Sequence, residues 1–192
     1  KKSYELIKIG HEFYLPTSNL NLDKKNMWPC DIIAYKQLNV PFRYRFSKCY
    51  WKRDLKREKQ VFKELVGDNK SYVFLHDDPM KNLIIDQKEI NHKYKIIRND
   101  YKYSIFDYGL ILENAKELHL MESCFRQLVE TLNTNKPKLY LYKGRGPDHS
   151  INLYNKKINK WIGTSKEWIV INDNIVKKNN NSLTFFKNFF KS

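Results

Sequence analysis

The feature that most restricts the fold of this chain is a regular alternation of short apolar runs with segments of helical pattern. An apolar run of about four residues between turn signals is typical of a buried strand. Such runs occupy residues 72–75, 95–97, 118–121 and 139–142. Strands that alternate with helices imply right-handed crossovers and therefore a parallel sheet. We expect an α/β fold with a Rossmann-like, mostly parallel sheet and flanking helices.

Helical patterns separate several of these runs. Residues 106–115 and 124–132 predict two helices after the second and third strands. A stronger helix is expected to begin after Asp54, whose side chain can cap it, and to end at Gly67. Its predicted buried face carries Leu55, Phe62, Leu65 and Val66.

We divide the chain into three parts. Residues 1–66 are expected to form an N-terminal strand, a loop and a helical connection, with a short helix at 31–38. Residues 67–176 form the Rossmann-like core, in which 167–171 predicts either a terminal helix or an added strand. Residues 177–192 are a polar linker followed by an amphipathic tail with four phenylalanines, expected to dock on this domain or on a missing one.

The composition suits one globular domain. The chain has 192 residues, of which 41% are hydrophobic, and this is enough apolar material for a single core. It has no run of eighteen apolar residues and no signal-peptide layout, so we expect no membrane span. Its three cysteines form no C-x-x-C pair, which indicates a reducing, cytoplasmic location. Because the first residue is not methionine, we also expect a segment upstream of Lys1.

The net charge of +15 favours anionic partners. Lysines are scattered through every segment instead of forming one cluster. A basic nucleic-acid-binding module is nevertheless an alternative, in which Lys, Arg and the thirteen tyrosines contact phosphates and stack on bases. Basic groups that converge at strand ends would favour a small anionic ligand over nucleic acid.

Polar side chains follow each of the four predicted strands. In an open parallel sheet, ligands bind outside the carboxyl ends of the strands. The candidate site residues that follow the strands in order are His76, Asp77 and Asp78, then Arg98, then Glu122 and Ser123, and finally Lys143 and Arg145. We expect His76, Arg98, Ser123 and Lys143 to surround one anionic ligand.

Each of these residues also has a structural interpretation. Ser123 either binds a phosphate, aided by the dipole of the helix that it opens, or only caps that helix. Arg98 either makes a bidentate contact to a diphosphate or is a solvated surface arginine. The segment that begins at His76 offers a base and carboxylates, or forms a turn ended by Pro79. The loop Lys143-Gly144-Arg145-Gly146 lets backbone approach a ligand, or is an ordinary basic turn.

Several common signatures are missing from the sequence. It contains no G-x-S-x-G, no G-x-x-x-x-G-K-[ST] and no G-x-G-x-x-G motif, which disfavours the common hydrolase, P-loop and dinucleotide-binding classes. The remaining histidines show no metal-ligand spacing. We therefore expect no metal and no cofactor.

A series of short motifs covers roughly residues 9–142. They are Val40-Pro41-Phe42, Tyr50, Arg53-Asp54, Arg57-Glu58, residues 72–79, Ile105-Phe106-Asp107-Tyr108, residues 113–119 and Ser123-x-Phe125. Their order resembles a glycosyltransferase-like group found in bacterial polysaccharide loci and large viruses, similar to the two-lobed fucosyltransferases and heptosyltransferases. The chain departs from the family pattern at Glu122, where aspartate is usual, and after Pro79, where a glycine is usual.

The resemblance implies a transferase whose C-terminal lobe binds a nucleotide diphosphate-sugar and passes a hexosyl or deoxyhexosyl group to a glycan acceptor without a metal. Arg98, Ser123, Lys143 and Arg145 would bind the donor diphosphate. His76 or Asp77 would orient or deprotonate an acceptor hydroxyl, and Asp78 and Glu122 would line the cleft. An N-terminal lobe, largely missing here, would carry the acceptor side. An inactive transferase-like interaction domain is a further alternative, because fold alone does not establish activity.

Overall fold

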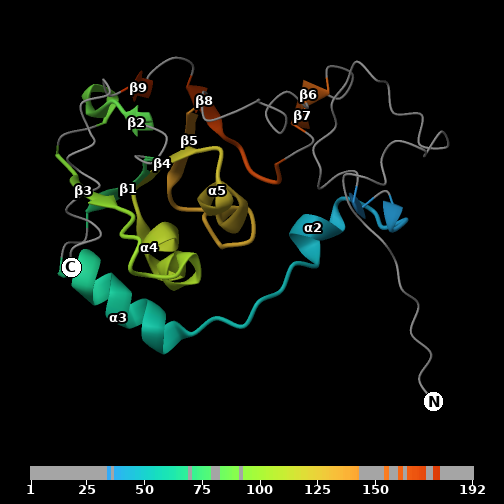
Figure 1. Cartoon of the computed structure of the whole chain (residues 1–192), viewed down its shortest axis with the longest axis horizontal. Helices are drawn as coiled ribbons and strands as arrows, with labels where there is room; N and C mark the ends of the chain where they lie inside the picture. Colours follow the sequence, from blue (N-terminus) through green and yellow to red (C-terminus); the bar gives the residue numbers. More distant parts are fainter. Residues whose placement is uncertain are drawn as a thin grey trace. The chain divides into compact units, whose positions relative to one another are not determined.

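The structure is a computed structural model that describes residues 34–35, 37–68, 71–78, 83–90, 93–142, 154–155, 160–161, 164–171 and 175–177. The chain forms two compact units (Figure 1). One consists of Lys1–Tyr50 with His149–Ser165, and the other of Trp51–Asp148 with Lys166–Ser192. The four strands predicted for the parallel sheet all lie in the second unit.

The second unit contains a five-stranded sheet in the order β3-β1-β4-β5-β8. Its strands are β1 (Tyr72–His76), β3 (Lys95–Arg98), β4 (Glu117–Met121), β5 (Lys138–Tyr142) and β8 (Ile169–Ile171). Every neighbouring pair is parallel. The expected α/β fold with a Rossmann-like parallel sheet is thus confirmed, and the segment 167–171 supplies an added strand.

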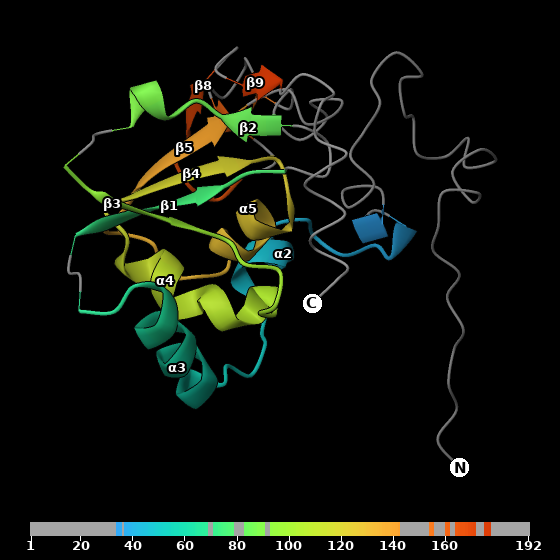
Figure 2. The same ribbon diagram turned by 60° about the vertical axis from the view of Figure 1, so that its left-hand side comes forward.

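Different elements pack on the two faces of the sheet. The helices α3 (Leu55–Leu65), α4 (Gly109–Asn114) and α5 (Cys124–Val129) lie on one side, and the strand β2 (Leu83–Ile85) lies on the other (Figure 2). On the helical side the Phe74 ring lies 5.4 Å from that of Phe125. On the opposite side Val73 and Leu75 belong to one buried cluster with residues of β2. Because apolar side chains cover both faces, β1 is buried along its whole length.

Helix α3 follows the prediction at its ends and departs from it on its buried face. The Asp54 carboxylate accepts a hydrogen bond from the Arg57 N–H at 3.0 Å, and Gly67 adopts the left-handed φ of 68° that ends the helix. Leu55, expected to be buried, is 50% exposed, whereas Glu58 is only 1% exposed. Glu58 turns inward because its carboxylate binds Arg53 and the Leu110 N–H.

Other elements differ from the predicted boundaries. The helix expected at 106–115 is a 3₁₀ turn, η5 (Ile105–Tyr108), followed by α4, and α5 ends at Val129, before the expected residue 132. The crossover from β1 to β3 contains β2 and the 3₁₀ turn η4 (Gln87–Glu89), and β2 pairs antiparallel with β9 (Ile175–Lys177). The sequence analysis did not find these short elements, because three residues show no measurable periodicity.

In the first unit, residues 34, 35 and 37 are helical, in keeping with the helix expected at 31–38. This unit also contains α2 (Tyr44–Ser47) and the antiparallel pair of β6 (Tyr154–Asn155) with β7 (Lys160–Trp161). The predicted N-terminal strand, the polar linker and the amphipathic tail lie outside the described residues. In the described part of the chain, no helix has the length and apolar character needed to cross a membrane.

Candidate functional site

The order of the strands creates a switch point between β1 and β4. From β1 the chain crosses to β3 at one side, then returns over β1 to place β4 at its other side. In such sheets the crevice forms outside the carboxyl ends of the two strands at which the direction of winding reverses. The residues that end β1 and follow β4 are His76 and Ser123.

His76 and Ser123 lie in direct contact across this switch point. The Ser123 Oγ is 3.3 Å from His76 Nδ1, and both side chains are buried. The His76 ring packs against Phe125, with ring centroids 4.7 Å apart. Although Ser123 is the residue before the first turn of α5, its side chain makes no capping hydrogen bond. The Ser123 hydroxyl therefore faces His76, and the capping interpretation does not describe it.

Asp77 and Arg98 form the second contact at the carboxyl edge. One carboxylate oxygen of Asp77 accepts a hydrogen bond from the Ile85 N–H at 2.8 Å, and the other forms an ion pair with Arg98 Nη1. Both oxygens of Asp77 are thus engaged. The Arg98 side chain is 35% exposed. Partial burial lowers the pKa of Arg98, but a guanidinium remains charged at neutral pH.

The strand register separates these contacts between the two faces of the sheet. Arg98 is paired with Leu75, so its side chain leaves the sheet on the β2 side, where Asp77 binds it. His76 is the next residue along β1, and its ring lies on the opposite side, against Phe125 of α5. The structure therefore brings His76 to Ser123 and Asp77 to Arg98 as two separate pairs at one edge of the sheet. Arg98 and Ser123 lie on opposite faces, so the structure does not bring these expected ligand-binding residues into one cluster.

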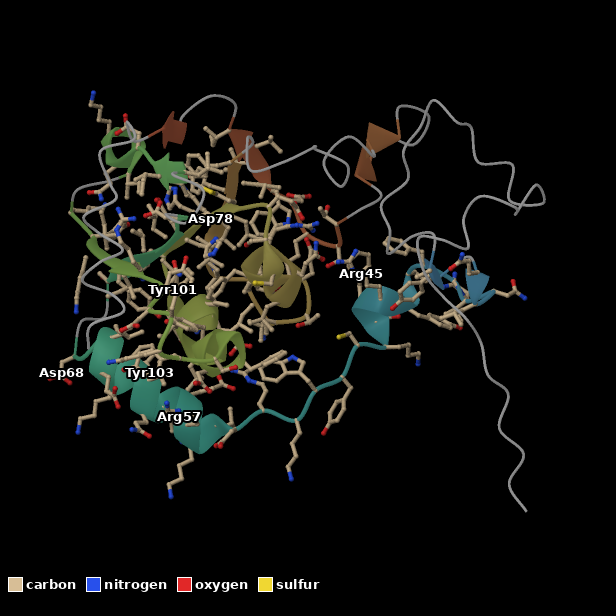
Figure 3. All side chains as sticks on the ribbon, viewed as in Figure 1. Arg45, Arg57, Asp68, Asp78, Tyr101 and Tyr103 are labelled. Carbon is tan, nitrogen blue, oxygen red and sulfur yellow. The ribbon has the colours of Figure 1, made fainter. Side chains whose placement is uncertain are left out.

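The two residues expected to line the cleft, Asp78 and Glu122, both make hydrogen bonds within the protein. Asp78 is buried, and its backbone exchanges two hydrogen bonds of 3.0 Å with Leu83, which starts β2. The Glu122 carboxylate accepts hydrogen bonds from Arg126 at 2.9 Å and from Gln127 at 3.1 Å. Asp78, labelled in Figure 3, thus pairs through its backbone with the start of β2 where the chain leaves β1.

The sequence analysis did not assign Arg126 or Gln127 to the site. The spacing of four residues between Glu122 and Arg126 is the available signal, because side chains at that spacing meet on one helix face. Lys143 and Arg145, the other two expected diphosphate ligands, lie outside the described residues. Among the described residues no group of three or more His, Cys, Asp or Glu is arranged to hold a metal ion.

The chain was compared with known protein families, curated proteins and solved structures, and none of them matches it. The chemistry of the site is therefore argued from its own geometry.

Proposed function

We propose that this chain binds a nucleotide diphosphate at the carboxyl edge between β1 and β4. In this proposal it is the donor-binding lobe of a glycosyltransferase that moves a hexosyl or deoxyhexosyl group from a nucleotide diphosphate-sugar to a glycan acceptor. The observation that carries the proposal is the contact between Ser123 Oγ and His76 Nδ1 at the topological switch point.

The His76–Ser123 pair has the chemistry to bind a phosphate oxygen. When His76 carries its proton on Nδ1, it donates that proton to Ser123 Oγ. The hydroxyl hydrogen of Ser123 is then directed to another acceptor, and a phosphate oxygen is a suitable one.

In this proposal Arg98 supplies the positive charge, from the same carboxyl edge but from the opposite face of the sheet to Ser123. Asp77 holds Arg98 through Nη1, and a guanidinium carries five N–H donors, so this ion pair leaves donors for a ligand. Its exposed portion allows the charge to reach an anion outside the sheet. Together with the net charge of +15, this favours a ligand with several negative charges. Arg98 and Ser123 would also stabilise the diphosphate as it leaves the sugar, which is an electrostatic contribution to catalysis.

The same tautomer assigns a catalytic role to His76 over Asp77. A neutral histidine with its proton on Nδ1 has a lone pair on Nε2, which is what a general base for an acceptor hydroxyl requires. Asp77 already accepts from Ile85 and Arg98, so we assign it the role of orienting Arg98.

The backbone at Ser123 argues against the main hydrolytic alternative. In serine hydrolases of α/β type, the nucleophile sits on a sharp, strained turn between a strand and a helix. Ser123 has φ −162° and ψ 176°, which is ordinary extended backbone. We therefore infer that Ser123 donates a hydrogen bond to the ligand and does not form a covalent intermediate.

The proposal is tested first by a thermal-shift screen of the full chain with UDP, GDP, ADP, UDP-glucose and GDP-mannose. A ligand at one hundred times its dissociation constant should stabilise the fold by about 2.7 kcal/mol. The best ligand is then titrated calorimetrically into the wild type, Ser123→Ala and Arg98→Ala. We expect affinity to fall about fivefold for Ser123→Ala and about 10- to 100-fold for Arg98→Ala, because a charged donor contributes more than a neutral one.

Arg57→Ala is the matched control for Arg98→Ala. Arg57 is also paired with an aspartate, Asp107, and its side chain is 39% exposed, close to the value for Arg98. Arg57 belongs to α3, away from the strand ends, so its replacement should leave affinity unchanged. The proposed site is wrong if none of these nucleotides stabilises the wild type, or if folded Ser123→Ala and Arg98→Ala bind as the wild type does.

A further inference from the structure

A buried network of charged side chains connects the turn before Ser123 with the last strand of the sheet. Arg126 is at its centre, with a side chain that is 0% exposed. The Arg126 guanidinium binds Glu122 through Nε at 2.9 Å and Glu130 through Nη1 at 3.3 Å. Glu130 in turn accepts a hydrogen bond of 2.8 Å from the indole N–H of Trp168, next to β8. The network therefore runs from Glu122 to Trp168.

Stability alone is a weak explanation for such a network. Burying a guanidinium and its carboxylates removes their hydration, and apolar side chains of similar volume often stabilise a core as well or better. Buried ionic groups fix geometry instead, because their hydrogen bonds are directional. The geometry that this network fixes is that of the turn containing Ser123, between β4 and α5.

The turn needs such support because α5 is short. The helix has six residues, Cys124–Val129, and a helix of that length is marginal without tertiary contacts. Ser123 adds no side-chain cap. Glu122, one residue earlier, holds the start of the helix through side chains instead, since its carboxylate accepts from Arg126 Nη2 at 3.0 Å and from Gln127 Nε2 at 3.1 Å. These bonds join the end of β4 to the second turn of α5.

We propose that Glu122 and Arg126 are positioning residues that hold Ser123 against His76, and that Glu130 and Trp168 connect this position to the docking of β8. Neither Glu122 nor Arg126 is assigned a contact with the ligand. The effect on His76 follows from the protein alone, whereas the effect on ligand affinity rests on the proposed function.

The primary test observes His76 directly in the full chain without ligand. The ring nitrogens of histidine, labelled with ¹⁵N, report by NMR the tautomer and the hydrogen bond at each nitrogen. The His76 signal is assigned with His76→Asn, and Ser123→Ala shows its value when the Ser123 partner is absent. We expect Glu122→Gln and Arg126→Met to move the His76 signal toward the Ser123→Ala value. Arg126→Lys should restore part of the wild-type signal, because it retains the charge.

Glu113→Gln is the matched control for Glu122→Gln. Glu113 accepts a hydrogen bond of 2.8 Å from Arg53, in an ion-pair cluster that Glu58 completes between α3 and α4. Its replacement removes an equivalent partly buried charge and should leave the His76 signal unchanged. If Arg126→Met does not fold, Glu122→Gln carries the same comparison. A wild-type His76 signal in folded Glu122→Gln would overturn the inference.

A second measurement separates this inference from the proposed function. When a nucleotide diphosphate binds the wild type, Glu122→Gln should weaken its binding about fivefold, as loss of the oriented Ser123 donor does. A shifted His76 signal with unchanged affinity would refute the role of the network in ligand binding. If no nucleotide binds the wild type, the proposed function fails while the His76 signal still decides whether the network positions Ser123.

Discussion

Ser123 Oγ lies 3.3 Å from His76 Nδ1, although the two residues are 47 positions apart in the chain. The contact exists because the chain crosses to β3 before it returns to place β4 beside β1. In the ladder between β1 and β4, His76 is paired with Leu120, so its ring lies close to the turn that follows β4. The pairing of these residues is therefore a direct consequence of the strand order.

Cys124 offers a way to map ligand binding without changing the site. It is exposed, and it is the first residue of α5, directly after Ser123. A nucleotide diphosphate that binds Ser123 should cover this thiol, so its reaction with a maleimide should slow about tenfold at a ligand concentration ten times the dissociation constant. Peptide mass spectrometry over time measures the rate. Cys49 is also exposed and serves as the internal control, and equal slowing at both cysteines would contradict a site at the β4–α5 turn.

The ion pair between Arg53 and Glu58 leaves no room for a side chain at Gly109, the first residue of α4. A Cβ atom at this position would lie 2.5 Å from the Glu58 carboxylate and 2.7 Å from the Arg53 guanidinium. Glu58 is buried and also accepts the Leu110 N–H at 2.8 Å, so it cannot move without losing a hydrogen bond. We expect Gly109→Ala to lower the free energy of unfolding in urea by about 1–3 kcal/mol.

The control for this change is Gly67→Asn. Gly67 has a positive φ and nothing closer than 3.9 Å to an added Cβ, and asparagine tolerates the left-handed conformation. Its cost should be well below that of Gly109→Ala. Equal stability of Gly109→Ala and the wild type would show that the Arg53–Glu58 pair is not held as described.

His119 should make the stability of the fold depend on pH. It is buried in β4, with Nδ1 2.8 Å from the Tyr142 hydroxyl and Nε2 3.0 Å from Glu117, and its ring is stacked on Tyr140. Burial lowers the pKa of His119, and this outweighs the hydrogen bond that His119 donates to Glu117, which raises the pKa. The folded protein thus binds the proton less readily than the unfolded chain.

It follows that stability is highest above the pKa of the unfolded histidine and falls as the pH drops from about 7 to about 5. Melting temperatures measured across this range in the wild type and in His119→Gln test the effect, because glutamine does not titrate. The slope with pH should be smaller in His119→Gln. An identical slope in both proteins would mean that His119 does not control it.

Oligonucleotide binding should be weak and independent of sequence. Tyr103, which is labelled in Figure 3, is not available for stacking: its ring is buried, the Arg57 guanidinium lies 5.5 Å from its centroid, and its hydroxyl binds Glu64. The spread of positive charge supports non-specific binding, for which a dissociation constant of about 10⁻⁴–10⁻⁶ M at physiological salt and a steep salt dependence are typical. Fluorescence anisotropy with random DNA and RNA at several salt concentrations measures both. Tight, sequence-selective binding would instead support a nucleic-acid-binding module.

The parallel sheet and the polar character of its carboxyl edge could be predicted from the sequence alone. A buried strand is recognisable in the sequence as a short apolar run, such as residues 72–75. A loop after a strand can be polar without destabilising the core. The ends of α3 could also be predicted from the sequence, because Asp54 caps the helix and Gly67 ends it through contacts and backbone angles within one helical turn. Each of these signals is local, so no knowledge of distant residues was needed.

Which polar groups come into contact depends on the tertiary structure. Local periodicity predicts neither the order of the strands nor their register. Together, order and register bring His76 to Ser123 and place Arg98 on the other face, where Asp77 binds it. The inward turn of Glu58 has the same origin, since a residue on a charged helix is buried only because Arg53 and a distant N–H satisfy it. Contacts between residues far apart in sequence depend on how the whole chain packs, and for that reason the geometry of the site had to come from the fold.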